Sequence, residues 1–207
     1  MMGTDTNPGL IPRIMDHIFG EQKSLEGKLI AVSIFEIYNE SIYDLLSSKM
    51  EKSKSLDIGL SKTGVVCVKK IKHIIISNKN DIFKLLKMAE KNRIVSKTKM
   101  NHESSRSHLV FNIRLCSSNK IETKTSSLKG FKESKTSIYD VPFVELSIID
   151  LAGSERAKKT EAEGKTLKDA SGINLSLSIL WRCVRLVKSN QDNNKDEIIS
   201  WRLKKKN

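Results

Sequence analysis

The feature that most constrains the fold is an apolar run at residues 28–38, Lys-Leu-Ile-Ala-Val-Ser-Ile-Phe-Glu-Ile-Tyr. The run is rich in β-branched and aromatic residues and almost continuously apolar, which predicts a strand that is covered on both faces. Residues 143–149 predict a second buried strand, and residues 109–116 alternate apolar with polar as a half-buried strand would. Three such strands indicate a sheet at the centre of the molecule.

Helices are predicted between and after these strands. Residues 9–19 predict a helix entered through a proline, whose missing N–H costs little in a first turn. A second helix, capped by Asn78 or Asn80, is expected to run through Lys91. A third, at 166–188, has apolar residues at spacings of three and four. Strands alternating with helices predict an α/β fold, with a central, mostly β-sheet flanked by helices.

Two stretches look less regular. Residues 65–76 are rich in β-forming residues and predict a hairpin or meander that begins after Thr63-Gly64. Residues 117–139 are rich in Lys, Ser and Thr and lack periodicity. We therefore expect them to form one long solvated loop between two strands.

The composition narrows the class of protein. Lys and Arg total 37 against 24 Asp and Glu, a net charge of +13, which favours an acidic partner. The three cysteines form no C-x-x-C pair, so neither a disulfide framework nor a zinc site is indicated. The sequence has no signal peptide and no apolar run near the roughly 20 residues of a membrane span. We expect a soluble protein of the cytosol or nucleus, with no membrane partner.

Chemically informative residues gather in two segments, one of which is 150–156, Asp-Leu-Ala-Gly-Ser-Glu-Arg. The preceding strand would place Asp150 at an edge of the sheet, where its carboxylate can hold Mg²⁺ directly or through water. Gly153 has no side chain to keep its N–H away from a phosphate oxygen. Asp-x-x-Gly alone is equally well explained by an ordinary turn after a strand. The full seven-residue segment is more specific.

The other segment is 101–108, Asn-His-Glu-Ser-Ser-Arg-Ser-His. The hydroxyls of Ser104 and Ser105 and the guanidinium of Arg106 can supply a Mg²⁺ ligand, a hydrogen bond to a γ-phosphate and a cation from one loop. Taken alone, Ser-Ser-Arg-Ser is more often an ordinary serine-rich turn. Both segments in this order, each beside a strand, favour a pair of nucleotide-sensing switches.

The chain resembles kinesin motor domains over essentially its whole length. Besides 101–108 and 150–156, the matching stretches are Gly-Leu-Ile-Pro-Arg at 9–13, Phe-Glu-Ile-Tyr-Asn-Glu at 35–40 with Tyr-Asp-Leu-Leu at 43–46, and residues 163–177. Agreement across five ordered motifs is not accidental. Arg182-Cys183 and the Asn-rich stretch before Trp201-Arg202 favour the mitotic kinesin-like protein group.

The resemblance implies a P-loop-type motor fold that uses ATP and Mg²⁺ and binds microtubules. It makes residues 101–108 switch I and residues 150–156 switch II. The nucleotide-binding residues that it implies are Asn101, Ser104, Ser105 and Gly153, and the metal ligands are Ser105 and Asp150.

The resemblance also implies how catalysis would work. Ser104 and the Gly153 amide would sense the γ-phosphate, while Arg106 and Glu155 would pair across the switches as the site closes around ATP. This arrangement suits phosphoryl transfer, in which positioning and electrostatics do most of the catalysis. Switch movement would then reorient the helix at 166–188 on the track.

Basic residues near the end of the chain suit an acidic track such as tubulin. The candidate microtubule contacts are Lys168, Arg182, Arg185, Lys188 and Arg202. For each residue alone a merely solvated face is about as good an explanation, and the whole set is more persuasive. We expect the protein on the cytoskeleton in the cytoplasm, including the spindle.

The match fails at the phosphate cradle, because no Gly-x-x-x-x-Gly-Lys-Ser/Thr loop occurs in the 207 residues. The family pattern places this loop and the first strands before a segment that resembles residues 1–4. Without these amides and the lysine, nucleotide affinity should fall by several kcal/mol. We expect weak or absent ATP binding and no useful ATPase in this chain alone, as for a motor-domain fragment, a mis-set gene start or a degenerate motor.

Two other functions stay open. A nucleotide-independent microtubule-binding protein would need only the basic helix. A nucleic-acid binder is favoured by charge alone, since aromatic residues make up 5% and no recognisable nucleic-acid module is present. We therefore do not expect nucleic acid as a partner, and the oligomeric state cannot be read from these residues.

Overall fold

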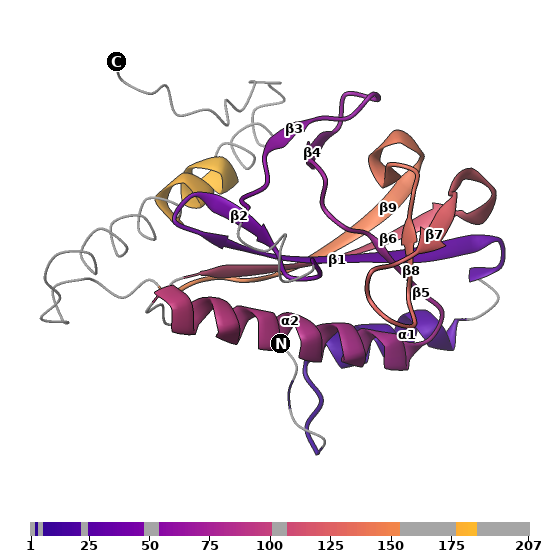
Figure 1. Ribbon diagram of the computed structural model, residues 1–207, viewed down its shortest axis with the longest axis horizontal. Coiled ribbons are helices and arrows are strands. Elements are labelled where there is room, and N and C mark those ends of the chain that lie inside the picture. Colours follow the sequence, from indigo (N-terminus) through magenta and orange to yellow (C-terminus); the bar gives the residue numbers. More distant parts are fainter. Residues whose placement is uncertain are drawn as a thin grey trace, which may run out of the picture. The chain divides into compact units, whose positions relative to one another are not determined.

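The computed structural model describes residues 3, 6–21, 25–47, 54–100, 107–153 and 177–185. The chain divides into two compact units, Met1–Ala152 and Gly153–Asn207. In the first unit, a twisted sheet is covered on one face by two helices (Figure 1). In the second, the described part is a helix at 177–185.

A seven-stranded sheet organises the first unit. Its strands follow the order β7 (Thr123–Thr125), β8 (Lys132–Ser134), β5 (Ile74–Ile76), β1 (Lys28–Tyr38), β6 (His108–Ser117) and β9 (Phe143–Asp150), with β2 (Ser41–Asp44) also paired to β1. Every pair in this list is antiparallel. A separate hairpin joins β3 (Ile58–Leu60) to β4 (Val66–Val68). The predicted central sheet is confirmed.

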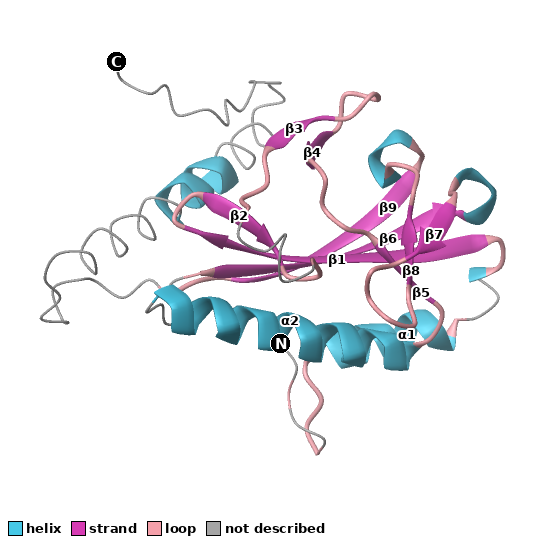
Figure 2. Ribbon diagram, in the orientation of Figure 1, coloured by secondary structure: helices cyan, strands magenta, loops and turns pink. Residues whose placement is uncertain are grey.

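The helices α1 (Leu10–Gly20) and α2 (Lys79–Met100) lie along the same face of the sheet (Figure 2). Their apolar residues, including Ile11 and Leu85, join Ile34 and Phe111 of the strands in one buried cluster. The second predicted helix therefore exists but extends to Met100, nine residues beyond its expected end. No Gly or Pro interrupts residues 92–100, so nothing local ends the helix earlier.

Strand β1 is buried on both faces, as its composition predicts. Val32 faces the helices, while Ala31 and Phe35 contact two smaller clusters on the opposite face. The turn into β2 contains Asn39 and Glu40 with φ of 45° and 60°. Two left-handed residues in a two-residue loop are what a tight antiparallel hairpin requires.

The prediction of one solvated loop at 117–139 is wrong. The segment contains β7 and β8, which extend the sheet beside β5, and two short 3₁₀ turns at Ser118–Lys120 and Ile138–Asp140. Ile121, Ile138 and Tyr139 are buried. These few apolar residues near the two ends of a polar stretch show no periodicity, yet each fills a gap on the sheet face opposite the helices.

Two further expectations differ in detail. The hairpin or meander predicted at 65–76 does not form within that stretch, because β4 pairs with β3, which precedes Thr63-Gly64, and β5 pairs with β1 and β8. Strand β9 exists but is not buried within the described residues, where β6 is its sole partner and Val144 is 72% exposed. An apolar run predicts a strand without showing how many neighbours cover it.

Candidate functional site

The sheet brings the two motif segments to one place. Strand β6 begins at His108, the last residue of the segment 101–108, and β9 ends at Asp150, the first residue of the segment 150–156. The two strands pair antiparallel with Leu109 opposite Asp150. The end of one segment and the start of the other therefore lie side by side, an arrangement we call the switch junction (residues 107–109 and 150–152).

A hydrogen bond closes the switch junction. The backbone N–H of Ala152 donates to Nδ1 of His108 at 2.9 Å, and both residues are buried. Burial lowers the pKa of His108 below its ordinary value, which favours the neutral imidazole. Only a neutral imidazole can accept this bond at Nδ1, because both ring nitrogens donate when the ring is charged.

A buried polar network holds the switch junction against the sheet and helix α2. Arg93 of α2 donates from Nη2 to the carbonyl and the hydroxyl of Ser107, each at 3.0 Å. The Ser107 hydroxyl donates to Glu36 Oε2 at 3.3 Å, and Arg93 Nε lies 3.6 Å from the same oxygen. Glu36 on β1 is 7% exposed. The network therefore fixes the residue that follows 101–106 against both the sheet and the helix.

Helix α2 is held in place by contacts near the end of β2. Asn92 Nδ2 donates to the carbonyl of Leu45 at 2.6 Å. The carboxylate of Asp44 accepts from the Leu46 N–H at 2.7 Å, and from the Ser47 hydroxyl and the Lys72 N–H at 3.0 Å each. Burial raises the pKa of Asp44 in spite of these bonds. Such a bonded turn gives α2, and so Arg93, a defined position.

The predicted phosphate- and metal-contacting residues fall partly inside the described ranges. Asp150 is exposed at the end of β9 and Gly153 is half-buried. Asn101, Ser104, Ser105, Arg106 and Glu155 lie outside the described residues. Among the described residues no group of three His, Cys, Asp or Glu could hold a metal ion by itself.

The predicted track-binding residues are also partly described. Arg182 and Arg185 are exposed on the helix at 177–185, as is Trp181 at 66%. Lys168, Lys188 and Arg202 lie outside the described residues. No helix in the described ranges is long and apolar enough to cross a membrane.

Sequence reasoning missed the supporting network. Ser107, His108 and Glu36 belong to the matching stretches but received no role, and Arg93 was not singled out. The available signal was Glu36, a lone carboxylate within an apolar run that was expected to be buried on both faces. A buried charge needs a partner, so this position predicts a cation nearby.

Comparisons with known proteins agree with this geometry. A model of the kinesin motor domain matches residues 1–205. Kinesin-like protein KIF20B of Mus musculus is 39% identical over 163 residues, which cover 77% of this chain and 8% of that protein. Kinesin-like protein KIF13B of Homo sapiens is 35% identical over 216 residues, covering 99% and 11%.

Solved structures show the same similarity. A KIF14 dimer in its two-heads-bound state, with AMP-PNP and in complex with a microtubule, matches with a TM-score of 0.70 and 30% identity. The match covers 96% of this chain and 53% of that one. A fast kinesin gives a TM-score of 0.68 and 32% identity, over 96% and 52%. The chain thus spans about half of these structures and a small part of the two curated relatives.

Proposed function

Because this chain belongs to the kinesin motor domain family, we propose that it acts as the switch-bearing and track-binding part of an ATP-driven microtubule motor. Kinesin motors bind nucleotide and Mg²⁺ in general, and one solved relative is a kinesin in complex with a microtubule. The observation that supports the proposal most directly is the switch junction, with its hydrogen bond between His108 and Ala152.

In this proposal the segments 101–108 and 150–156 both contact the γ-phosphate of ATP. Asp150 and Ser105 would hold Mg²⁺, which would supply positive charge to the phosphates. Ser104 and the Gly153 N–H would donate to γ-phosphate oxygens, and Asn101 would contact the nucleotide. Support comes from the exposed carboxylate of Asp150, which lies opposite Leu109 near the start of β6.

Closure of the site would pair Arg106 with Glu155 and position the attacking water. The switch junction would couple the two segments, because Ala152 is hydrogen-bonded to His108. Ser107, next to His108, is held by Arg93. A shift of residues 150–156 would then act on the end of 101–108 directly, as the switches of other nucleotide hydrolases do.

Track binding is proposed for the basic residues near the end of the chain. These are Lys168, Arg182, Arg185, Lys188 and Arg202, which would face the acidic surface of tubulin. The exposure of Arg182 and Arg185 supports the role. The same proposal places the protein in the cytoplasm, on the cytoskeleton and the spindle.

A second candidate is microtubule binding that does not respond to nucleotide. It is favoured by the exposed arginines on the helix at 177–185. Such a protein would use the helix without the switches.

Microtubule co-sedimentation of the chain at moderate salt tests both candidates. Because the chain alone is expected to bind nucleotide weakly at best, each nucleotide is used at millimolar concentration with Mg²⁺, and the motor proposal expects stronger pelleting in AMP-PNP than in ADP. Equal pelleting in both nucleotides would favour the second candidate, and no pelleting would overturn both. Asp150→Asn should abolish the nucleotide difference while leaving the nucleotide-free binding intact.

Matched charge variants identify the binding surface. Arg182→Ala combined with Arg185→Ala should weaken pelleting at least fivefold. Lys120→Ala combined with Lys135→Ala removes the same charge from the first unit and should leave pelleting unchanged. Equal loss in the two double variants would show that net charge, and not the helix, binds the track.

A further inference from the structure

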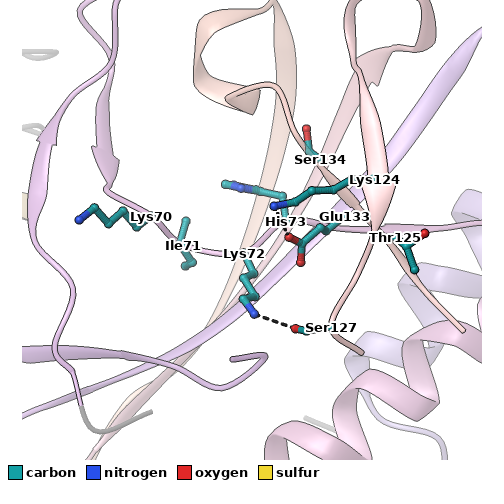
Figure 3. A pocket seen from close by; sticks show the side chains of 9 residues that line it. All are labelled: Lys70, Ile71, Lys72, His73, Lys124, Thr125, Ser127, Glu133 and Ser134. Carbon is teal, nitrogen blue, oxygen red and sulfur yellow. Dashed lines mark hydrogen bonds and ion pairs between the residues drawn. The ribbon is translucent and has the colours of Figure 1, made fainter. Parts of the chain in front are cut away.

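A cavity of about 480 Å³ lies among β7, β8 and the segment that leads into β5. In the strand order of the sheet this is the opposite side from the switch junction. Three lysines, Lys70, Lys72 and Lys124, line the cavity, and Glu133 is its single carboxylate (Figure 3). Three cations against one anion leave the cavity with an excess of about two positive charges, which attracts anions.

One serine of the lining already touches a lysine. Lys72 Nζ donates to the hydroxyl of Ser127 at 2.9 Å, drawn as a dashed line in Figure 3. Lys72 has a fixed backbone, because its N–H donates to the buried carboxylate of Asp44 at 3.0 Å. Lys124 lies beside the same cavity and pairs with Glu133 at 2.9 Å. The ammonium group of Lys72 is thus held against an exposed hydroxyl.

The turn that presents Ser127 is ordered by its own hydrogen bonds. The Ser126 N–H donates to the carbonyl of Phe131 at 3.0 Å, and the Phe131 N–H donates to Leu128 at 3.2 Å. Gly130 supplies the positive φ, 83°, that the turn needs. Leu128 and Phe131 pack on the main core, while Ser127 is exposed. The turn therefore directs one hydroxyl outward at a defined place.

We propose that Ser127 is a phosphorylation site and that the lysine-lined cavity is the receptor for its phosphate. A protein kinase would transfer the γ-phosphoryl group of ATP to Ser127: an O–P bond forms at Oγ, the bond to ADP breaks, and the hydroxyl proton leaves to the kinase's base. A phosphoserine carries a charge of about −1.5 to −2 at neutral pH, which matches the excess charge of the cavity.

Phosphorylation of Ser127 would strengthen the contact between the turn at 126–131 and Lys72. The neutral hydrogen bond between Lys72 and Ser127 becomes a charge-assisted one, and such bonds are roughly twice as strong. Lys70 and Lys124 lie around the same cavity and add attraction. The phosphate would thus link the turn at 126–131 to residues 70–72, which precede β5. Basic residues flank the site at 124 and 129, as suits a kinase with an acidic substrate groove.

The test uses the 207-residue chain with phosphoserine incorporated at position 127. Hydrogen exchange of the amides at 126–131 should slow by about fivefold or more relative to the unmodified chain, because the turn opens less often. In ³¹P spectra the phosphate should titrate at a lower pH than phosphoserine in a short peptide, since nearby lysines favour its dianion. Unchanged exchange together with a peptide-like titration would overturn the receptor.

Charge variants of the modified chain separate the cavity from net charge. Lys72→Gln should return the exchange rate most of the way to that of the unmodified chain and the titration most of the way to that of the short peptide. Lys135→Gln removes the same charge from an exposed pair with Glu122, outside the cavity, and should change neither. If Lys135→Gln acts as strongly as Lys72→Gln, the cavity is not the receptor.

Accessibility to a kinase is tested on the unmodified chain. Treatment with a basophilic serine kinase and ATP, followed by mass spectrometry, should modify Ser127. Ser126 is 8% exposed and donates to Glu133 at 3.1 Å, so it should stay unmodified. Ser127→Ala should abolish the modification, and phosphate on Thr125 or Ser126 instead of Ser127 would overturn the site. None of these outcomes depends on microtubule binding.

Discussion

Two polar clusters along strand β6 differ in which parts of the protein they connect. At its start, Ser107 and His108 bind Arg93 and the backbone of Ala152, and so join the two segments that carry the motifs. Further along, Arg114 is 1% exposed and binds side chains alone. The first cluster therefore connects the two segments that the proposed function expects to move relative to one another, and the second connects strands and a turn of the sheet.

The Arg114 cluster is built around a single guanidinium. Nη1 donates to Ser33 and Nη2 to the Tyr139 hydroxyl, each at 3.0 Å, and Nε forms an ion pair with Glu145. The same group lies over the rings of Tyr139 at 4.7 Å and Phe143 at 5.8 Å. It thus ties β1, β9 and the turn at 138–140 to β6, without touching either motif segment.

The largest effect is expected from Arg114→Ala. This change leaves a cavity and removes the cation from Glu145, which should lower the free energy of unfolding by about 3 kcal/mol. Urea denaturation followed by circular dichroism measures the loss. Lys132→Ala, at an exposed position of β8, should change stability by less than about 0.5 kcal/mol. A small loss for Arg114→Ala would mean that the cluster is dispensable.

Acid should destabilise the same region through His73. Burial, and next the charge of Arg114, lower the pKa of His73 from 6.5 to about 3. The unfolded chain takes up a proton below pH 6.5, while the folded chain stays neutral at this site until about pH 3. Stability is therefore lost as the pH falls through this window, by about 3 kcal/mol between pH 7 and pH 4.

The variant His73→Phe isolates this contribution. It retains a ring at the position where His73 meets Tyr139 edge to face, with centroids 5.3 Å apart. Its unfolding free energy should fall less steeply with acid than that of the parent chain, in urea titrations at several pH values. Parallel curves for the two chains would contradict the lowered pKa. Asp44 acts in the opposite direction, since burial raises its pKa, and it is common to both chains.

The two clusters also differ in how far the sequence predicted them. The switch junction follows from local signals, because each motif lies beside an apolar run and adjacent strands bring the ends of those runs together. The family resemblance added the roles of Ser105 and Asp150. What it could not give was the support by Arg93 and Glu36, which are separated by 57 positions and meet only because α2 packs against the sheet that contains β1.

The Arg114 cluster was not predictable in the same way. Its partners Tyr139 and Glu145 come from a polar stretch and from a strand expected to be buried, and no spacing rule links them. The same non-local packing explains why residues 117–139 were expected to be a loop. Ile121 and Ile138 are buried by residues far away in sequence, which periodicity within the segment cannot register.

A smaller change in stability, with a larger change in dynamics, is expected from His108→Ala. It leaves the buried N–H of Ala152 without its acceptor, which should cost about 1 to 2 kcal/mol. Hydrogen exchange of the Ala152 amide should accelerate strongly, while amides near Arg114 should not change. His108→Asn can place an amide oxygen near the position of Nδ1 and should restore most of the protection. Failure of that rescue would show that the ring acts through packing.

The smallest effect is expected where charge is exposed and packing is not involved. Lys135 and Glu122 form an ion pair of 3.1 Å with side chains 66% and 72% exposed, at the two ends of the hairpin that was expected to be a loop. Exposed pairs contribute about 0 to 1 kcal/mol, so Lys135→Ala should change the midpoint of urea unfolding very little, and less still in 1 M salt. A clear loss would mean that surface charge, and not Ile121 and Ile138, holds this segment to the sheet. The segment would then behave like the solvated loop that its composition suggests.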